Sequence, residues 1–395
     1  MSPDDPANHH IHAGRVASRD TVRLRIGIVA PPWLPTPPPA YGGTERVVAL
    51  VAAGLARRGH RVTLVAGHGS GVPGVEAVAP LDHLPEPIGE PSAERRFAAA
   101  AAEAVEGCDV VFDNASLVVT ERLLRADAPA VHVVHGVPDP AQVRAFTRMG
   151  PHAARLRLVA ISHSQAGRAA GLPFVGVCHN GLDLAEAPFA AGHEGYLAVV
   201  GRMCPEKGIE EAVAIARELG MPLRIAAKCR EPLELAYFRE RVEPHLGEDV
   251  AFLGELDRAA THRLLAGARA LLFPIRWEEP FGMVMIEALA AGTPVVALRR
   301  GAVPEVVRDG VTGFIGDTPA DLVAAARSLD RIDPHVCRGD VAARFSGPAI
   351  TRRYERLALA IAASEAERTS RSRAPGSLSR STRVRSSPPP ASPPG

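Results

Sequence analysis

The sequence predicts an α/β protein made of two units that face each other across a cleft. Short apolar runs alternate with helical patterns, and the whole alternation restarts near the middle of the chain. Strands that alternate with helices indicate a parallel sheet covered on both faces. The length of 395 residues agrees with this, because it exceeds the usual size of a domain with one hydrophobic core and is typical of two domains.

The first half of the chain contains six apolar runs of strand length. The run over residues 22–30 leads into a proline-rich loop and then a helix that begins near Thr44, with apolar residues on one face. A second helix is expected over residues 93–105. The other five strands are expected at residues 61–67, 109–114, 130–136, 157–162 and 174–181.

The second half repeats this order after a stretch rich in proline, glycine and charge. We place the domain boundary there, which gives an N-terminal domain of residues 22–183 and a C-terminal domain of residues 184–347. A last helix is expected over residues 348–367. The predicted strands are 196–201, 222–228, 250–254, 270–275 and 294–299, and the predicted helices are 209–219, 258–266 and 281–291.

Charge is distributed unevenly along the chain. Lys and Arg total 45 and Asp and Glu total 44, a formal charge of +1 that argues against a dedicated nucleic-acid binder. Residues 368–395 hold six Arg and no acid, so residues 1–367 carry −5. This Arg-, Ser- and Pro-rich tail and the leader of residues 1–21 are expected to be disordered.

Composition also indicates the compartment. Five dispersed cysteines without a C-x-x-C pair argue against a disulfide framework or a zinc site. The N-terminus has acids and histidines where a signal peptide needs basic and then apolar residues, and no apolar stretch approaches the roughly 20 residues of a membrane span. We therefore expect a cytoplasmic protein. His9, His10 and His12 could bind a metal, but they have no second ligand cluster beside them.

Three glycine-containing segments are candidates for ligand-binding loops. Gly69, Gly71 and Gly74 spell G-x-G-x-x-G, but Pro73 lies inside the motif and no helix follows, so we interpret it as a turn. Gly42 and Gly43 stand between a strand and a helix, where backbone amides can approach a ligand. The segment GRMCPEKG occupies an equivalent place in the second half, and its Arg202 and Lys207 suit a pyrophosphate.

The segment EEPFGMVMIEALAAGTPVVA is the most specific signal. Glu279 and Glu287 stand on either side of Pro280, Phe281 and Gly282, which mark a loop that enters a helix. A loop carboxylate can bind sugar hydroxyls, a helix carboxylate can bind both hydroxyls of a ribose, and the helix N-terminus between them can receive phosphate. Glu278 is expected to be a surface acid.

These segments, together with GGTERVV and GAVPEVVRDGVTGF, resemble retaining GT-B glycosyltransferases of the family-four, or group 1, type. The resemblance runs in order from about Arg25 to Glu367. It implies two Rossmann-like domains and a C-terminal helix that crosses back to the N-terminal domain. It also implies transfer of a sugar from a nucleoside diphosphate sugar to an acceptor hydroxyl with retention.

The resemblance assigns roles to individual residues. Arg202 and Lys207 would neutralise the donor diphosphate, Glu287 would bind the ribose, and Glu279 would hold the sugar. Backbone amides would approach the donor at Gly42, Gly43, Phe281, Gly282 and Met283. His135 matches the family's functional histidine, although it and His132 share a strand face and either could be a core residue. Asn180 matches the interdomain N-G-V/I-D element.

Donor chemistry is clearer from the sequence than acceptor chemistry. Asp113 and Asn114 end a strand and are candidate acceptor contacts. No Asp-x-Asp pair occurs, so we expect no catalytic metal and no cofactor, with a UDP-sugar as the first candidate donor. The expected acceptor is a glycan, a lipid or a small molecule. Between Asp139 and Asp183 there is no acid, and five cations there suit either a solvated face or peripheral membrane contact: Arg144, Arg148, Arg155, Arg157 and Arg168.

Two other classes of function remain open at this point. One is a nucleotide-sugar epimerase with the same two-domain architecture, and the other is a non-catalytic nucleotide-sugar-binding homologue. Neither the oligomeric state nor the acceptor follows from the residues.

Overall fold

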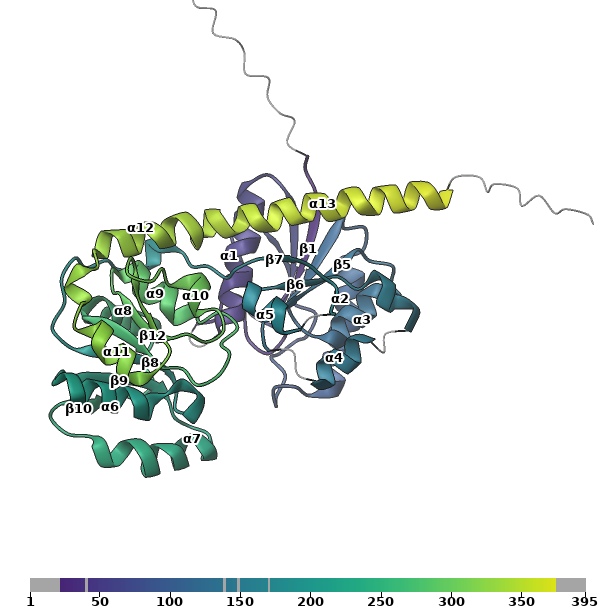
Figure 1. The fold of residues 1–395 in the computed structure, drawn as a ribbon. Helices are drawn as coiled ribbons and strands as arrows, with labels where there is room; N and C mark the ends of the chain where they lie inside the picture. The colour runs from purple at the N-terminus through teal and green to yellow at the C-terminus, as the bar shows by residue number, and fades with distance from the viewer. Residues whose placement is uncertain (1–21, 40–41, 138–139, 148–149, 170, 374–395) are drawn as a thin grey trace, which may run out of the picture.

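The computed structural model describes residues 22–39, 42–137, 140–147, 150–169 and 171–373. It confirms the predicted α/β class, because the chain forms two parallel sheets flanked by helices that lie side by side (Figure 1). His9, His10 and His12 lie outside the described residues, as does Arg148. Among the described helices, none combines the length and apolar composition needed to cross a bilayer.

The N-terminal domain contains a seven-stranded parallel sheet in the order β3-β2-β1-β4-β5-β6-β7. Alternate residues of a strand point to opposite faces, so Val110 and Phe112 of β4 pack toward α1 and α13, while Val111 packs toward α2 and α3. The strands are β1 (Arg25–Val29), β2 (Arg61–Val65), β3 (Glu76–Val78), β4 (Val110–Asp113), β5 (Ala130–Val134), β6 (Leu158–Ala160) and β7 (Phe174–Val177). The helices are α1 (Gly43–Arg57), α2 (Pro91–Ala104), α3 (Leu117–Arg125), α4 (Pro140–Thr147) and α5 (His163–Arg168).

The C-terminal domain contains a six-stranded parallel sheet in the order β10-β9-β8-β11-β12-β13. Helices α9 and α12 cover one face, and α6 and α11 cover the other. The strands are β8 (Leu197–Arg202), β9 (Leu223–Lys228), β10 (Val250–Phe252), β11 (Ala270–Phe273), β12 (Val295–Leu298) and β13 (Gly313–Gly316). The helices are α6 (Ile209–Leu219), α7 (Pro232–Tyr237), α8 (Arg258–Gly267), α9 (Met283–Ala291), α10 (Val303–Val306), α11 (Pro319–Ala326) and α12 (Pro334–Arg344).

Helix α13 (Gly347–Arg373) leaves the C-terminal domain and lies along the N-terminal domain (Figure 1). It packs closely on α1, because a Cβ at Gly54 would lie 2.0 Å from Thr351 Oγ1. Its Tyr354 ring meets Phe112 of β4 edge-on, with centroids 5.2 Å apart. The helix continues past the expected end at residue 367, which corrects the predicted start of the tail: Arg368 is still helical and bonds Glu365 at 2.7 Å.

Two strands and one helix start differ from the expectations. Strand β3 has only three residues, and β13 carries glycine at both ends, so neither has the composition typical of a strand. Helix α9 begins at Met283 instead of residue 281, because Gly282 precedes it with a φ of 79°. The segment with Gly69, Gly71 and Gly74 forms the loop between β2 and β3, which confirms the turn interpretation.

Candidate functional site

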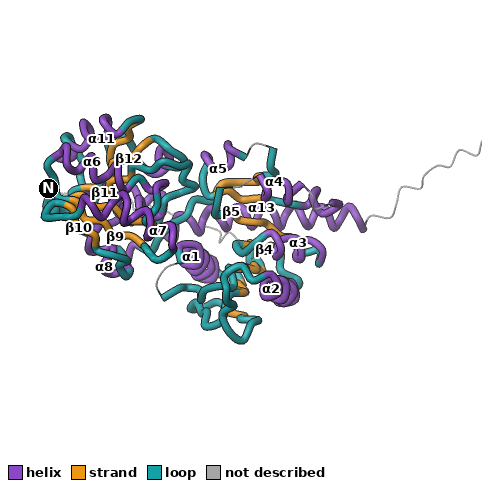
Figure 2. The backbone as a smooth tube through the Cα atoms, turned by 90° about the horizontal axis from the view of Figure 1, so that it is seen from below, coloured by secondary structure: helices purple, strands orange, loops and turns teal. Residues whose placement is uncertain are grey.

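A cavity of about 440 Å³ lies between the two domains. Seen from below, α1 occupies the side of the N-terminal domain next to the C-terminal domain (Figure 2), and its first residues line the cavity. The opposite wall comes from the carboxyl ends of β8, β9 and β11 and from the start of α9. Ligands of open parallel sheets bind at this edge of the strands. The predicted site residues in the lining are Gly42, Gly43, His135, Asn180, Arg202, Lys207, Glu279, Phe281, Gly282, Met283 and Glu287.

Two helices, one from each domain, begin at this cavity without a side-chain cap. Helix α1 follows Gly42, which has a φ of 144°, and helix α9 follows Gly282. A side chain at Gly42 would strike the Pro38 ring, since its Cβ would lie 2.7 Å from Pro38 Cγ. Unpaired first-turn amides and the helix dipole attract anions. The cavity therefore presents two positive helix ends toward a shared space.

The loop between β8 and α6 places two cations at the cavity. Gly208 has a φ of 67°, and a Cβ there would lie 1.9 Å from the carbonyl oxygen of Pro274, so only glycine allows the loop to lie against the end of β11. This packing brings Lys207 Nζ to 5.3 Å from the centre of the Trp277 ring. Arg202 ends β8 with an exposed side chain. Both cations line the cavity, as the sequence predicts.

Glu279 is held by side-chain and backbone contacts. Its Oε2 accepts hydrogen bonds from Lys207 Nζ at 2.6 Å and from Trp277 Nε1 at 3.2 Å. Its carbonyl oxygen accepts the Ala302 amide at 2.9 Å. Gly301 packs so tightly here that a Cβ would lie 2.2 Å from that oxygen. The carboxylate is thus fixed at the cavity wall.

Glu278 has a structural role in the same loop. Its Oε2 accepts the Gly301 amide at 2.7 Å and lies 3.7 Å from Arg168 of the N-terminal domain. The sequence predicts a surface acid, and the half-buried side chain instead ties the loop of Glu279 to the turn that precedes α10.

Glu287 lies in α9 and faces the N-terminal domain. Arg46, from the first turn of α1, interacts favourably with Glu287 and Glu186. Burial lowers the pKa of Arg46, and the nearby Arg258 lowers it further. The carboxylate proposed to bind a ribose therefore stands among cations contributed by both domains.

His135 lies at the carboxyl end of β5 and is half-buried. Its Nε2 is 2.9 Å from Asn114 Oδ1, so Asn114 orients the ring although it does not itself line the cavity. Burial, and to a lesser degree His132, lowers the pKa of His135 to about 3. The imidazole is therefore neutral near pH 7 and can share hydrogen bonds with uncharged hydroxyl groups.

Asp113 does not reach the cavity. Its side chain is fully buried, accepts the Ala115 amide at 2.8 Å and the Thr120 hydroxyl at 2.5 Å, and lies 3.2 Å from His132 Nδ1. This corrects the expectation that Asp113 contacts an acceptor, because its oxygens are already engaged inside the domain. His132 of β5 belongs to the same buried cluster, and His135, directly after β5, is the one of the two histidines that lines the cavity.

Asn180 lies between the domains at the cavity wall. It is only 6% exposed, and its Oδ1 is buried without a hydrogen-bond partner among the described residues. A buried amide oxygen without a partner is unfavourable, so this atom is suited to accept a bond from a ligand.

Three arginines of the acid-free interval have carboxylate partners. Arg155 bonds Asp127, Arg157 bonds Glu365 of α13, and Arg168 lies near Glu278. Each pair reduces the positive potential at the surface. The structure thus engages Arg155, Arg157 and Arg168 in intramolecular contacts.

Several cavity residues were not predicted from the sequence. Lys228 ends β9, and this position at the end of a strand could have identified it as a cavity residue from the sequence. Arg46 stands three residues after Gly43, in the first turn of the same helix, and could have been noticed for the same reason as Gly43. Arg258 and His262 lie on α8, and no pattern in the sequence indicates that this helix borders the cavity.

Comparison with known proteins agrees with this arrangement. Residues 41–187 match the Glycosyltransferase Family 4 family, and residues 185–332 match the family Glycosyl transferases group 1. The chain is 36% identical over 172 residues to a glycogen synthase of Mycobacterium tuberculosis, which covers 40% of each chain. It is 33% identical over 121 residues to the N-acetyl-alpha-D-glucosaminyl L-malate synthase of Bacillus anthracis, covering 29% of this chain and 31% of that one. The first match thus spans two fifths of that relative's length.

Solved structures share the fold over nearly the whole described chain. The glycosyltransferase AviGT4, involved in avilamycin A biosynthesis, superposes with a TM-score of 0.67 at 26% identity, covering 86% of this chain and 98% of that one. Sucrose-phosphate synthase from Thermosynechococcus elongatus gives 0.67 at 18% identity, covering 87% and 100%. The two family matches adjoin near Ala187 and divide the chain as its two sheets do. This chain therefore belongs to the group 1 glycosyl transferases and has the two-domain GT-B fold.

Proposed function

We propose that the protein transfers a sugar from a nucleoside diphosphate sugar to an acceptor hydroxyl, with retention of anomeric configuration. The observation that carries this proposal is the cavity between the domains, where the uncapped starts of α1 and α9 meet Arg202 and Lys207. Residues 1–367 carry a formal charge of −5, so positive potential for a diphosphate must come from local groups of this kind. Glu287 would hold the ribose, and Glu279 the transferred sugar.

The proposed chemistry needs no metal. As the bond between the anomeric carbon and the phosphate oxygen breaks, negative charge grows on the leaving diphosphate, and the two cations and the helix amides stabilise it. The acceptor oxygen bonds the same face of the anomeric carbon, and its proton passes to the departing phosphate oxygen. Glu279, whose Oε2 accepts a hydrogen bond from Trp277 Nε1, positions the sugar and forms no covalent bond with it.

The acceptor side of the cavity is polar and uncharged where His135 and Asn180 line it. The neutral ring of His135 and the unpartnered Oδ1 of Asn180 suit hydroxyl groups of a sugar or polyol. We take a hydroxyl-bearing glycan, glycolipid headgroup or small polyol as the acceptor class.

Calorimetric titration with UDP, GDP and ADP tests the nucleotide, with UDP as the first candidate. The sugar nucleotides of whichever base binds are then incubated with the enzyme, with and without acceptors, and products are followed by NMR of the anomeric proton. We expect an α-configured product from an α-configured donor, and transfer that persists in EDTA.

Variants separate this proposal from its alternatives. Glu279→Gln and Arg202→Ala should each lower transfer by roughly 100-fold. If both retain wild-type transfer, the site assignment is wrong. Isomerised donor in the absence of acceptor would indicate an epimerase, and tight nucleotide binding without transfer or hydrolysis would indicate a binding protein.

A further inference from the structure

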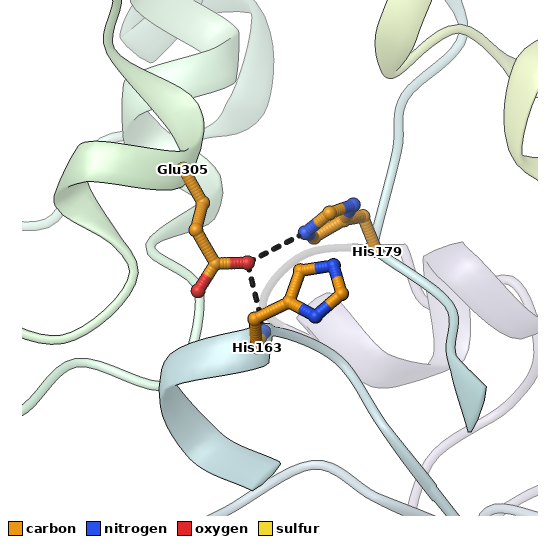
Figure 3. A group of neighbouring side chains, drawn as sticks. All are labelled: His163, His179 and Glu305. Carbon is orange, nitrogen blue, oxygen red and sulfur yellow. Dashed lines mark hydrogen bonds and ion pairs between the residues drawn. The ribbon is translucent and has the colours of Figure 1, made fainter. Parts of the chain in front are cut away.

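Three side chains of metal-binding types meet at the junction of the two domains (Figure 3). His163 is the first residue of α5, His179 follows β7, and Glu305 lies in α10 of the C-terminal domain. One possible ligand atom from each lies within 4.8 Å of the other two. None of the three lines the cavity described above, so the cluster is separate from the sugar-transfer site.

The carboxylate of Glu305 is oriented by the backbone of the other domain. Its Oε1 accepts the Ser164 amide at 2.7 Å, and its Oε2 accepts the His163 amide at 2.8 Å. Backbone bonds of this kind keep a carboxylate aimed in one direction, as the outer partners of metal ligands do. Glu305 therefore meets one requirement of a metal ligand without any metal present.

His179 is also held in place. Its Nε2 lies 2.9 Å from Glu305 Oε2, and its ring packs against Phe281 and Phe345, with centroids 5.9 Å and 5.8 Å away. The orientation of this ring is thus set by an acid and two aromatic side chains of the C-terminal half of the chain.

His163 is the exposed member of the cluster. Its ring stands beside that of His179, with centroids 5.8 Å apart, and makes no hydrogen bond or ion pair to the residues that the structure describes. An exposed ring can turn about its side-chain torsions at little cost. His163 can therefore move toward the other two ligands.

We propose that His163, His179 and Glu305 bind a Zn²⁺ ion, with water as the fourth ligand. Two imidazoles and one carboxylate are a ligand set that Zn²⁺ accepts, at about 2.0–2.2 Å from each ligand atom. Tetrahedral bonds of that length separate ligand atoms by roughly 3.3 Å. The His179–Glu305 pair must therefore widen by a few tenths of an ångström, while His163 closes in. The ion replaces the proton between His179 Nε2 and Glu305 Oε2, and His179 then carries its proton on Nδ1.

The ion would connect the two domains, because two ligands come from the N-terminal domain and one from the C-terminal domain. Phe281 packs against His179 and also lines the cavity. Bound Zn²⁺ thus holds the domain junction next to the donor side of the cavity. It takes no part in bond breaking, since its ligands lie outside the cavity lining.

Titration of the full-length chain with ZnCl₂ tests this site by calorimetry. His9, His10 and His12 could bind Zn²⁺ by themselves, so all measurements use a full-length variant with alanine at these three positions, called the parent. We expect one ion per parent chain and no detectable binding of Mg²⁺, which prefers oxygen ligands. His163→Ala should weaken Zn²⁺ binding by at least about 10-fold. His83→Ala, which removes another exposed histidine, should change it by less than about two-fold.

Thermal unfolding provides a second readout that does not depend on enzyme activity. Zn²⁺ should raise the Tm of the parent and of His83→Ala, and should leave that of His163→Ala unchanged, because a ligand that binds only the native state stabilises it. Glu305→Gln should also lose Zn²⁺ binding; if it fails to fold, the exposed His163 still decides the question. A parent that binds no Zn²⁺, or equal binding by the parent and His163→Ala, overturns the proposal.

Discussion

Replacing Glu279 by glutamine should separate nucleotide binding from sugar transfer. In the ligand-free protein, Lys207 Nζ is bonded to Glu279 Oε2 at 2.6 Å, so the acid and the donor diphosphate compete for the same cation. Glutamine keeps the size of the side chain and removes its charge. We expect Glu279→Gln to bind the nucleoside diphosphate more tightly and to transfer sugar more slowly.

The size of the binding effect follows from the burial of the pair. The Lys207 and Glu279 side chains are 16% and 12% exposed, so their pair lies between surface pairs worth about 0–1 kcal/mol and buried pairs whose disruption costs about 3–5 kcal/mol. A diphosphate that bonds Lys207 replaces most of the lost attraction. We take about 1 kcal/mol as the remaining difference, which is roughly a five-fold lower Kd.

Calorimetry with the nucleotide that binds the wild-type protein measures this change, and release of that nucleotide from its sugar donor measures turnover. Glu278→Gln is the matched control: it makes the same chemical change one residue away, at a side chain bonded to Gly301 and Arg168, and should leave the Kd within about two-fold. Weaker nucleotide binding by Glu279→Gln, or unchanged turnover, would refute the competition between Glu279 and the diphosphate.

Three further predictions concern other parts of the molecule. Burial lowers the pKa of His135 to about 3, so between about pH 6.5 and pH 3 the unfolded chain binds a proton there and the native chain does not. The free energy of unfolding should therefore fall as pH drops through this range, and urea unfolding of His135→Gln should show a shallower fall. Burial raises the pKa of the Cys178 and Cys337 thiols to about 12, so mass spectrometry after iodoacetamide treatment should find both unmodified in the native protein and modified in urea. Gly54→Ala should lower the free energy of unfolding by about 1–3 kcal/mol, because the new methyl group clashes with Thr351. Adding Thr351→Ala should restore part of the lost stability, and a Gly54→Ala protein as stable as the wild type would contradict this prediction.

The sequence predicted the site best where its residues stand at strand ends and helix starts. Arg202 ends one strand, and Glu279 stands in the loop that leads from another strand to a helix. Parallel strands bring these points to one edge of the sheet. The periodicities of strands and helices were therefore sufficient to predict that these donor-side residues lie close together. The glycines at Gly42 and Gly282 were equally informative, because each has a backbone conformation that favours glycine.

Contacts between strands were not predictable in the same way. Asp113 pairs in register with His132 of β5, and this neighbour, together with Thr120 of α3, draws its carboxylate into the domain. A single sequence contains the two strands but not their register, so Asp113 was misplaced at the cleft.

The packing of one domain against the other was also not predictable from the sequence. Arg46 reaches the surroundings of Glu287, and Glu305 bonds the start of α5, because two rigid units meet at a particular angle. No periodicity within either unit encodes that angle. The interdomain residues of the cavity and the cluster of His163, His179 and Glu305 consequently became visible only in the structure.

The chain passes between the domains twice, and the two passages lie together. Leu182, on the way out, donates its amide to Phe345 at 3.0 Å, and Gly347, on the way back into α13, donates to Leu182 at 3.1 Å. Because the two adjoining connections share hydrogen bonds, we expect relative motion of the domains to be a rotation about this line. Helix α13, 27 residues and roughly 40 Å long, continues from the second connection along the N-terminal domain. A rotation about this line would change the separation of Gly42 and Gly282, which lie on opposite walls of the cavity.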